Sequence, residues 1–281
     1  MSSSSKVKAG NTKTKSAPSD SALVTLDGVS KAYGEAWMSD EVLKDISIEF
    51  PAGELTVIVG PSGCGKSTLV NIMAGFETPD TGSVSVDGKP IQGPAKDRMV
   101  VFQETALIPW QTTLENVTFG PKMRGEKKGA SLKKEAEDLL IKVGLGEVMN
   151  KYPIQPSGGM QRRAELARAL INEPNVMIMD EPFRGLDAMS RSLMQEFFLQ
   201  LFDENRKTNI FVTSEIDEAI FLADNLVILS NKPTRVQKVI KIDLPRPRNY
   251  KMLTSAKAFE YKREAMELLH DEAMKRFAVA K

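Results

Sequence analysis

The residues best suited to chemistry lie in one glycine-rich run, Gly60-Pro61-Ser62-Gly63-Cys64-Gly65-Lys66-Ser67-Thr68. A glycine, four further residues, then glycine, lysine and serine form the phosphate-loop pattern. Glycines let successive backbone N–H groups converge on a phosphate without a Cβ atom in the way, and a following helix adds the partial positive charge of its N-terminus. We therefore expect this run to bind ATP, with Lys66 on the β- and γ-phosphate oxygens and the Ser67 hydroxyl on Mg²⁺.

A second run places two acids at the end of an apolar segment, Val176-Met177-Ile178-Met179-Asp180-Glu181. A buried strand of this kind would deliver Asp180 to the Mg²⁺. Glu181, one step beyond the strand, can take a proton from the attacking water as a general base. Acids also end strands simply because they meet solvent there, so the catalytic interpretation depends on the phosphate loop that accompanies them.

The segments around both motifs alternate in the periodicity of their apolar residues. Apolar or period-two runs predict strands at residues 23–26, 46–50, 55–59, 99–102, 176–179, 210–212 and 226–229. Apolar residues at helical spacing predict helices at residues 68–73, 132–143, 164–170 and 190–202. Strands that alternate with helices predict an α/β sheet, in which the phosphate loop lies between a strand and a helix, as its chemistry requires.

Composition divides the chain into three parts. Residues 1–21 are rich in Ser, Lys, Thr and Asn and predict a disordered tail, with a basic contact to acidic lipid as the alternative. Residues 22–240 hold the alternating pattern and form the predicted nucleotide-binding domain. Residues 241–281 begin basic and proline-interrupted and end in a helix predicted at about residues 255–277, which forms a C-terminal extension.

Charge, cysteine content and hydropathy limit the function. Lys and Arg number 38 against 37 Asp and Glu, so the overall balance does not indicate a nucleic-acid partner. The single cysteine, Cys64, excludes an internal disulfide and fits a reducing compartment. No window approaches the roughly 20 consecutive apolar residues of a spanning helix, so a membrane function would require a separate membrane chain.

A third motif indicates the kind of nucleotide machine. Ser157-Gly158-Gly159-Met160, followed by the helical segment at residues 161–170, resembles the signature motif of ATP-binding cassette (ABC) proteins. A serine and two bare glycines at a helix start make a second anion site. The resemblance implies that this site closes over the γ-phosphate bound to an opposite cassette. It also implies the ABC type of P-loop NTPase fold, with a β-rich N-terminal part, a RecA-like core sheet and a helical signature subdomain.

The same resemblance, which covers residues 23–229, implies further roles in ATP binding. Tyr33 is similar to the aromatic residue that stacks on adenine. Trp37 is close enough in sequence to compete for that role, and either ring could instead belong to the core. Asp187 matches the residue that communicates across the cassette dimer.

Gln103 is similar to the glutamine that senses the γ-phosphate and the metal. The implied Mg²⁺ ligands are therefore Ser67, Gln103 and Asp180. Residues 107–110 would then lie near the groove that receives a coupling helix from the permease.

Within the family, several segments look most like the ATPases of nitrate, sulfonate and taurine importers: residues 102–103 with 107–110, the Ser-Gly-Gly-Met variant at 157–160, residues 218–224, residues 244–248 and the final helix. This resemblance implies an ATP hydrolase that drives import of a small anion or sulfonate-like solute. Its implied partners are transmembrane permease subunits, a second ABC ATPase subunit and a solute-binding protein. Its implied place is peripheral, on the cytoplasmic face of the inner membrane. The cargo stays unidentified, because in such importers the binding protein and the permease select it.

One position departs from the family pattern at the centre of the chemistry. Ser214 follows the strand at residues 210–213 where a histidine that contacts the γ-phosphate is usual, and the sole histidine is the distant His270. Serine donates one short hydrogen bond and cannot carry a proton at neutral pH. Arg184 is also bulky for a position that is usually glycine or another small residue.

The departure leaves two hypotheses. In the first, Glu181 sustains slow hydrolysis in a homodimer without the histidine. In the second, the chain is a degenerate ATP-binding or regulatory cassette that pairs with a histidine-bearing catalytic partner. Cassette proteins that act on DNA or ribosomes form a further class, but they carry a long coiled-coil insertion or two cassettes in one chain, and this sequence has neither.

Overall fold

Two β-sheets form the centre of this computed structural model, which describes residues 21–35, 39–125 and 129–279. The larger sheet has the strand order β10-β9-β3-β8-β7-β6, and the smaller sheet has the order β2-β1-β4-β5. Neighbours in the larger sheet are parallel, except that β10 is antiparallel to β9, and the smaller sheet is antiparallel. The larger sheet comprises β3 (Leu55–Val59), β6 (Arg98–Val101), β7 (Val176–Asp180), β8 (Thr208–Thr213), β9 (Asn225–Leu229) and β10 (Val236–Lys241). The smaller sheet comprises β1 (Val24–Tyr33), β2 (Asp40–Phe50), β4 (Thr81–Val86) and β5 (Lys89–Pro90).

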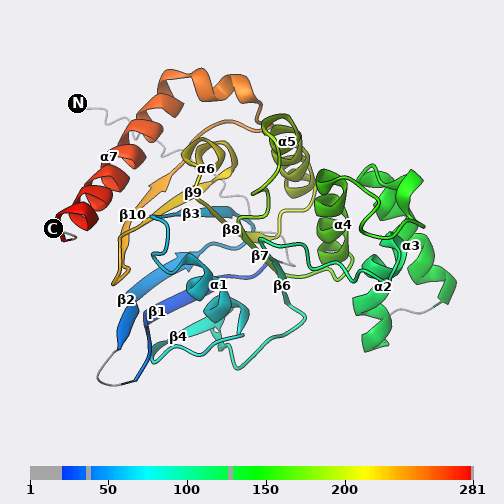
Figure 1. Cartoon of the computed structure of the whole chain (residues 1–281), viewed down its shortest axis with the longest axis horizontal. Helices are drawn as coiled ribbons and strands as arrows, with labels where there is room; N and C mark the ends of the chain where they lie inside the picture. Colours follow the sequence, from blue (N-terminus) through cyan, green and yellow to red (C-terminus); the bar gives the residue numbers. More distant parts are fainter. Residues whose placement is uncertain (1–20, 36–38, 126–128, 280–281) are drawn as a thin grey trace, which may run out of the picture.

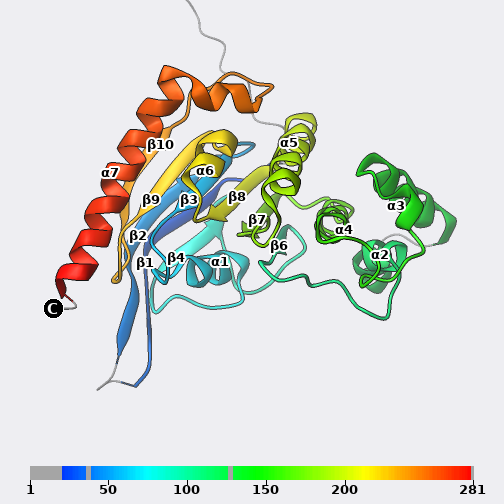
Figure 2. The same ribbon diagram turned by 45° about the horizontal axis from the view of Figure 1, so that its top comes forward.

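The helices lie around these sheets in three places. They are α1 (Lys66–Ala74), α2 (Thr113–Arg124), α3 (Gly129–Lys142), α4 (Gly158–Leu170), α5 (Ala188–Glu204), α6 (Ile216–Leu222) and α7 (Ala256–Val279), with short 3₁₀ turns at Gly146–Val148 and Tyr250–Thr254. Figure 1 shows α2, α3 and α4 together beyond the β6 edge of the larger sheet, while α7 runs along the opposite side beside β10. Figure 2 shows α1 near the smaller sheet and α5 and α6 near the strands β7, β8 and β9.

Each face of the larger sheet is buried against a different layer. Along β3, Val57 packs in the cluster formed with α5, α6 and the C-terminal segment, whereas Ile58 packs with α1 and the smaller sheet. Successive side chains of a strand point to opposite faces, so a strand covered on both sides must be apolar throughout. All five residues of β3 and of β7 are buried. The continuous apolar runs that precede both chemical motifs therefore have a packing cause.

A third hydrophobic cluster holds the helical part together. Val117 on α2, Ala136 on α3 and Ala167 on α4 are among its fully buried members. Residues 132–143 had predicted α3, but α2 was not predicted. The start of α2 nevertheless carries a signal in the sequence, because the Thr112 and Glu115 side chains form a reciprocal capping box.

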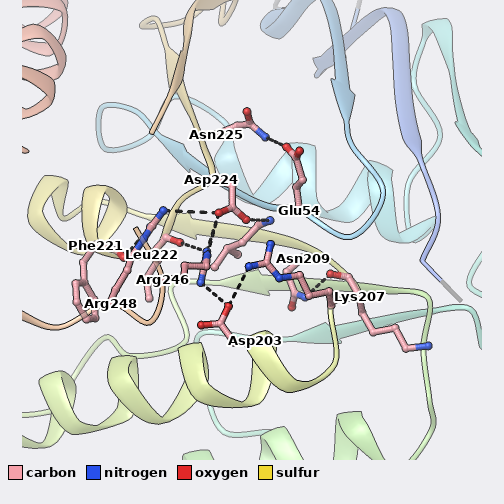
Figure 3. Close-up of polar contacts among 12 residues, drawn as sticks. Glu54, Asp203, Lys207, Asn209, Phe221, Leu222, Asp224, Asn225, Arg246 and Arg248 are labelled. Atoms are coloured by element: carbon pink, nitrogen blue, oxygen red, sulfur yellow. Dashed lines mark hydrogen bonds and ion pairs between the residues drawn. The ribbon is translucent and has the colours of Figure 1, made fainter. Parts of the chain in front are cut away.

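The C-terminal segment is fastened to the cassette by two arginines. Arg246 donates to Oδ1 of Asp224 at 2.8 Å and to Oδ1 of Asp203 at 3.0 Å, as Figure 3 shows. Arg248 donates to the carbonyl of Phe221 at 2.9 Å, and the Tyr250 ring stacks on Phe221 with centroids 4.4 Å apart. The clasp is defined here as Arg246, Arg248 and Tyr250 together with their partners. The partners are Asp203 on α5, Phe221 on α6 and Asp224 just before β9.

The fold class is confirmed: an antiparallel N-terminal sheet, a mostly parallel core sheet and a helical subdomain are all present. The disordered tail was predicted at residues 1–21, and residues 1–20 of it lie outside the described residues. Trp37 also lies outside them. Across the described ranges, none of the helices is long and apolar enough to cross a lipid bilayer.

Candidate functional site

The glycine-rich run lies between the buried strand β3 and the start of α1. Gly65 is the N-cap of α1, with φ of 101°, and a Cβ atom there would approach Cγ1 of Val42 to 2.5 Å. Both the left-handed backbone and the close contact require glycine at this position. The first turn of α1 leaves backbone N–H groups without helical partners, which makes its N-terminus an anion site.

Lys66 and Ser67 begin the helix and face different partners. The Lys66 ammonium donates to the carbonyls of Gly60 at 2.9 Å and Pro61 at 3.1 Å, which holds the side chain along the loop. The Ser67 hydroxyl donates to Oδ2 of Asp180 at 2.7 Å. The structure therefore brings together the glycine-rich run and the acid-ended strand, as the sequence predicts.

The pair Ser67 and Asp180 fits a hard divalent cation. Hydroxyl and carboxylate oxygens are the ligand types that Mg²⁺ prefers, and Mg²⁺ usually takes only one or two protein groups beside phosphate oxygens and water. Burial raises the pKa of Asp180, while the hydrogen bond from Ser67 opposes that rise. Because burial disfavours the charged carboxylate, a bound cation would stabilise its ionised form.

Glu181 lies one residue beyond β7 in an unusual backbone conformation. Its φ is 44°, and its backbone N–H donates to the carbonyl of Val212 on β8 at 2.9 Å. A non-glycine residue with positive φ is uncommon and is concentrated at functional sites. The Glu181 side chain is 11% exposed, and its Oε2 lies 2.8 Å from Nη1 of Arg184.

Ser214 follows β8 next to this acid. Parallel pairing places Val212 opposite Asp180, so the backbones of Ser214 and Glu181 leave the sheet at the same edge. Ser214 is exposed. No hydrogen bond within the described part of the chain joins its hydroxyl to Glu181, so the two residues are neighbours in topology without a direct contact.

A series of hydrogen-bonded polar side chains, called the polar chain below, begins at Thr213, the residue before Ser214. Thr213 accepts a hydrogen bond from the backbone N–H of Glu215 at 3.0 Å and donates to Glu218, which also accepts from Gln195 at 2.6 Å. Tyr250 donates to Gln195, and burial raises the pKa of Tyr250 to about 12, so this hydroxyl keeps its proton. Sequence reasoning did not identify this chain as part of the site.

The predicted adenine residue lies beside the phosphate loop. The Tyr33 hydroxyl donates to Glu77 and lies 3.4 Å from Oγ1 of Thr68 on α1. Its side chain belongs to an exposed residue at the end of β1, with 39% of its surface accessible, and Lys31 lies over the ring at 5.6 Å. The ring therefore has a free surface on which a base could stack.

The signature residues begin α4 as expected. Ser157 is the N-cap, and its side chain accepts a hydrogen bond from the backbone N–H of Met160 at 3.4 Å. A Cβ atom on Gly158 would lie 3.6 Å from Cδ2 of Leu186, the residue before Asp187. Asp187 caps α5, and hydrogen bonds from Ser190 hold its pKa below its ordinary value.

Gln103 contacts the signature helix through its backbone. Its backbone carbonyl accepts a hydrogen bond from Arg162, which also contacts the Phe102 carbonyl at 3.0 Å and Glu165 at 2.6 Å. The Gln103 side chain is exposed, and none of the hydrogen bonds in the described ranges joins it to Ser67 or Asp180. The buried pair Arg162 and Glu165 was not predicted, although both follow the signature motif directly.

A groove of about 470 Å³ lies between the core sheet and the helical subdomain. Phe76 and Phe102 are stacked in its wall, with ring centroids 6.0 Å apart, and Arg124 and Arg168 add positive charge. Ala106 also lines it, and residues 107–110 follow directly. Trp110 is 77% exposed.

Comparisons with known proteins agree with this geometry. Residues 43–184 match the ABC transporter family. The chain is 41% identical over 260 residues to a bicarbonate transport ATP-binding protein of Synechocystis, covering 90% of this chain and 92% of that protein. It is 42% identical over 223 residues to a taurine import ATP-binding protein of Pseudomonas aeruginosa, covering 79% and 84%. A dimeric ATP-binding cassette solved in a post-hydrolysis state with ADP and Pi has a TM-score of 0.69 and 30% identity, covering 79% of this chain and 100% of that chain.

Proposed function

This chain belongs to the ABC transporter family as an ATP-binding, ATP-hydrolysing subunit, and we propose that it powers the import of a small oxyanion-bearing solute through a separate permease. The observation that carries the ATP-hydrolysing part of this proposal is the 2.7 Å hydrogen bond between Ser67 and Asp180. It joins the phosphate loop to the acid-ended strand and places Glu181 directly beside that junction.

The proposed roles follow from the chemistry of the groups. Ser67 and Asp180 would hold Mg²⁺, with Gln103 as a further ligand, and bound Mg²⁺ would neutralise charge on the phosphate oxygens. Lys66 holds a positive charge next to the phosphates, and Tyr33 stacks on adenine. Glu181 accepts the proton of the water that attacks the γ-phosphorus.

A second cassette supplies the other half of each proposed site. Ser157, Gly158, Gly159 and Met160 form the anion site of the opposite subunit, and Met160 is 37% exposed at the start of α4. Asp187 lies next to this start, where it can report on closure of the dimer. Both a homodimer and a heterodimer would use this arrangement.

The permease would dock in the groove between the two subdomains. The Phe76 and Phe102 rings offer an apolar wall of stacked aromatics. Arg124 and Arg168 at the same groove favour a partner segment that carries carboxylates. A short helix with an apolar face and acidic ends fits these two features, and the exposed Trp110 would pack beside it.

The solute class is inferred from the named relatives. They transport bicarbonate and import taurine or aliphatic sulfonates, which all carry an oxyanion. We infer a small solute of this chemistry, delivered by a solute-binding protein, with the present chain peripheral on the cytoplasmic face of the inner membrane.

The test is phosphate release from Mg-ATP by the chain purified with its permease. Glu181→Gln should lower kcat by about 10²- to 10⁴-fold, the usual contribution of a general base, and should leave ATP binding intact. Glu196→Gln changes an exposed glutamate on α5 in the same way and should leave kcat unchanged. Equal rates for wild type and Glu181→Gln would contradict the assignment of the base. A silent wild type that Ser214→His activates would instead favour the degenerate cassette.

A further inference from the structure

The turn after β7 holds a guanidinium against the proposed base. Nη1 of Arg184 lies 2.8 Å from Oε2 of Glu181, and the Arg184 backbone N–H donates to the Glu181 carbonyl at 3.1 Å. The backbone turn thus places the two side chains on the same side. Glu181 is 11% exposed at its side chain, whereas Arg184 is 62% exposed. The arginine therefore reaches from solvent onto a carboxylate that is largely covered.

The Glu181 carboxylate has little conformational freedom. The Glu181 backbone is fixed by its N–H bond to Val212 and by its φ of 44°, so only side-chain torsions remain. A glutamate side chain has several rotamers, and a base contributes to rate only in the one that faces the water. The contact with Arg184 engages Oε2 and restricts these torsions, and none of the hydrogen bonds in the described ranges engages Oε1.

The neighbouring end of β8 does not fix the Glu181 carboxylate. Ser214 leaves β8 at the same edge, but its side chain is one short, uncharged hydroxyl. Arg184 offers what Ser214 lacks, namely a permanent positive charge, a longer reach and several N–H donors. Two of the departures from the family pattern, Arg184 and Ser214, thus follow the strands β7 and β8 at the edge of the sheet where Glu181 lies.

We propose that Arg184 is a positioning residue for ATP hydrolysis, which fixes the carboxylate of Glu181 and takes over the task that Ser214 cannot perform. This inference rests on the proposed function of the site. In the step concerned, the water oxygen forms a bond to the γ-phosphorus as its proton passes to Oε1 of Glu181. The bond from the γ-phosphorus to the bridging oxygen breaks, and its electron pair leaves on the β-phosphate of ADP. Arg184 keeps Oε1 aimed at the water throughout.

The test is a cycle of four chains, each with its permease: wild type, Arg184→Gln, Ser214→His and the double variant. Phosphate release and ATP affinity are measured for each. Arg184→Gln should lower kcat by about 10- to 100-fold, the scale expected for a misplaced catalytic group, with ATP affinity within about twofold of wild type. Ser214→His should restore most of that loss in the double variant. Arg184→Lys should retain an intermediate rate, because it keeps the charge without the guanidinium fork.

A matched control removes the ion pair of Lys44 with Glu41, which has the same three-residue spacing as Arg184 and Glu181. Lys44 and Glu41 are three positions apart, 2.7 Å from each other and about equally exposed. Lys44→Gln should leave kcat unchanged, because exposed ion pairs add little to stability.

Three outcomes would overturn the proposal: an Arg184→Gln rate equal to wild type, a loss of ATP affinity that matches the loss of rate, or no rescue by Ser214→His. If Glu181→Gln abolishes hydrolysis while Arg184→Gln does not lower it, this inference fails alone. If the wild type binds ATP without hydrolysing it, the proposed function fails and this inference fails with it.

Discussion

The hydroxyl of Ser67 and the carboxylate of Asp180 are joined by a 2.7 Å hydrogen bond across 113 positions of the chain. One member begins α1 and the other ends β7, so the bond spans the junction of the phosphate loop and the acid pair. Because both groups are oxygen ligands of the kind that Mg²⁺ prefers, a substitution at this junction should change Mg²⁺ binding directly.

Ser67→Ala should therefore weaken Mg²⁺-dependent ATP binding by about tenfold or more, since a polar contact to a charged group contributes about 1.5–3 kcal/mol. Calorimetric titration with ATP, in Mg²⁺ and in EDTA, measures the effect. Ser192→Ala removes a hydroxyl on α5 that donates to the carbonyls of Ala188 and Met189, and it serves as the control. An unchanged difference between the Mg²⁺ and EDTA titrations would argue against Ser67 as a metal ligand.

Phe76→Ala should weaken association with the permease by roughly tenfold, because it removes one of two stacked rings that are worth about 0.5–1.5 kcal/mol beyond their buried area. ATP binding by the isolated chain should not change. The measurement is recovery of the permease in detergent with the tagged chain. Phe259→Ala truncates an exposed ring on α7 and should recover the permease fully. Equal losses for both variants would place the docking surface elsewhere.

Glu218→Gln should alter how the unfolding free energy depends on pH. Burial raises the pKa of Glu218 above its ordinary value of 4.5, while hydrogen bonds from Thr213 and Gln195 oppose the rise. The folded chain therefore holds this proton more tightly than the unfolded chain. Stability from this group is full below 4.5 and is lost as the pH rises through the higher folded pKa.

The glutamine variant lacks this titration, so its unfolding free energy should fall less than that of the wild type as the pH rises above 4.5. Urea denaturation at a series of pH values provides the comparison. Glu267→Gln, on the exposed face of α7, should follow the wild type. Parallel curves for Glu218→Gln and wild type would show that burial does not govern this carboxyl group.

Arg246→Ala should lower the unfolding free energy by about 2–3 kcal/mol, because it removes the cation that two partly buried acids share. Asp203 keeps Arg206 at 3.3 Å and Asp224 keeps Arg248 at 3.6 Å. Its side chain is 12% exposed, and Asp203 and Asp224 are 25% and 17% exposed, so the loss should be smaller than for a fully buried pair. Urea denaturation measures it. Lys257→Ala breaks an exposed pair with Asp243 nearby and should leave the denaturation midpoint unchanged. A loss for Lys257→Ala as large as that for Arg246→Ala would mean that burial of the clasp contributes nothing.

The sequence predicts best where a local pattern determines the structure. The phosphate loop, the buried strand before Asp180 and the helix start at Ser157 each depend on glycines, apolar runs or a capping serine within a few residues. The helix α2 has only a weak apolar pattern, so the capping signal of Thr112 and Glu115 was its one clear mark.

The polar chain from Tyr250 through Gln195 and Glu218 to Thr213 could not be predicted, because it joins four separate elements. Each residue alone is typical of a helix or strand surface, and only packing turns it inward. The ion pair of Arg184 with Glu181 could be predicted only in part. The unusual arginine is visible in the sequence, but its partner depends on the turn that the backbone makes.

The clasp has a consequence for exchange of parts between transporters. Asp203, Phe221 and Asp224 lie within the predicted nucleotide-binding domain, yet their partners Arg246, Arg248 and Tyr250 lie in the C-terminal extension. A chimaera spliced at residue 240 would combine acids and a ring from one parent with a foreign tail. Such hybrids should fold well only when the donor tail brings the same two arginines and the tyrosine, so the tail and the cassette should be exchanged together.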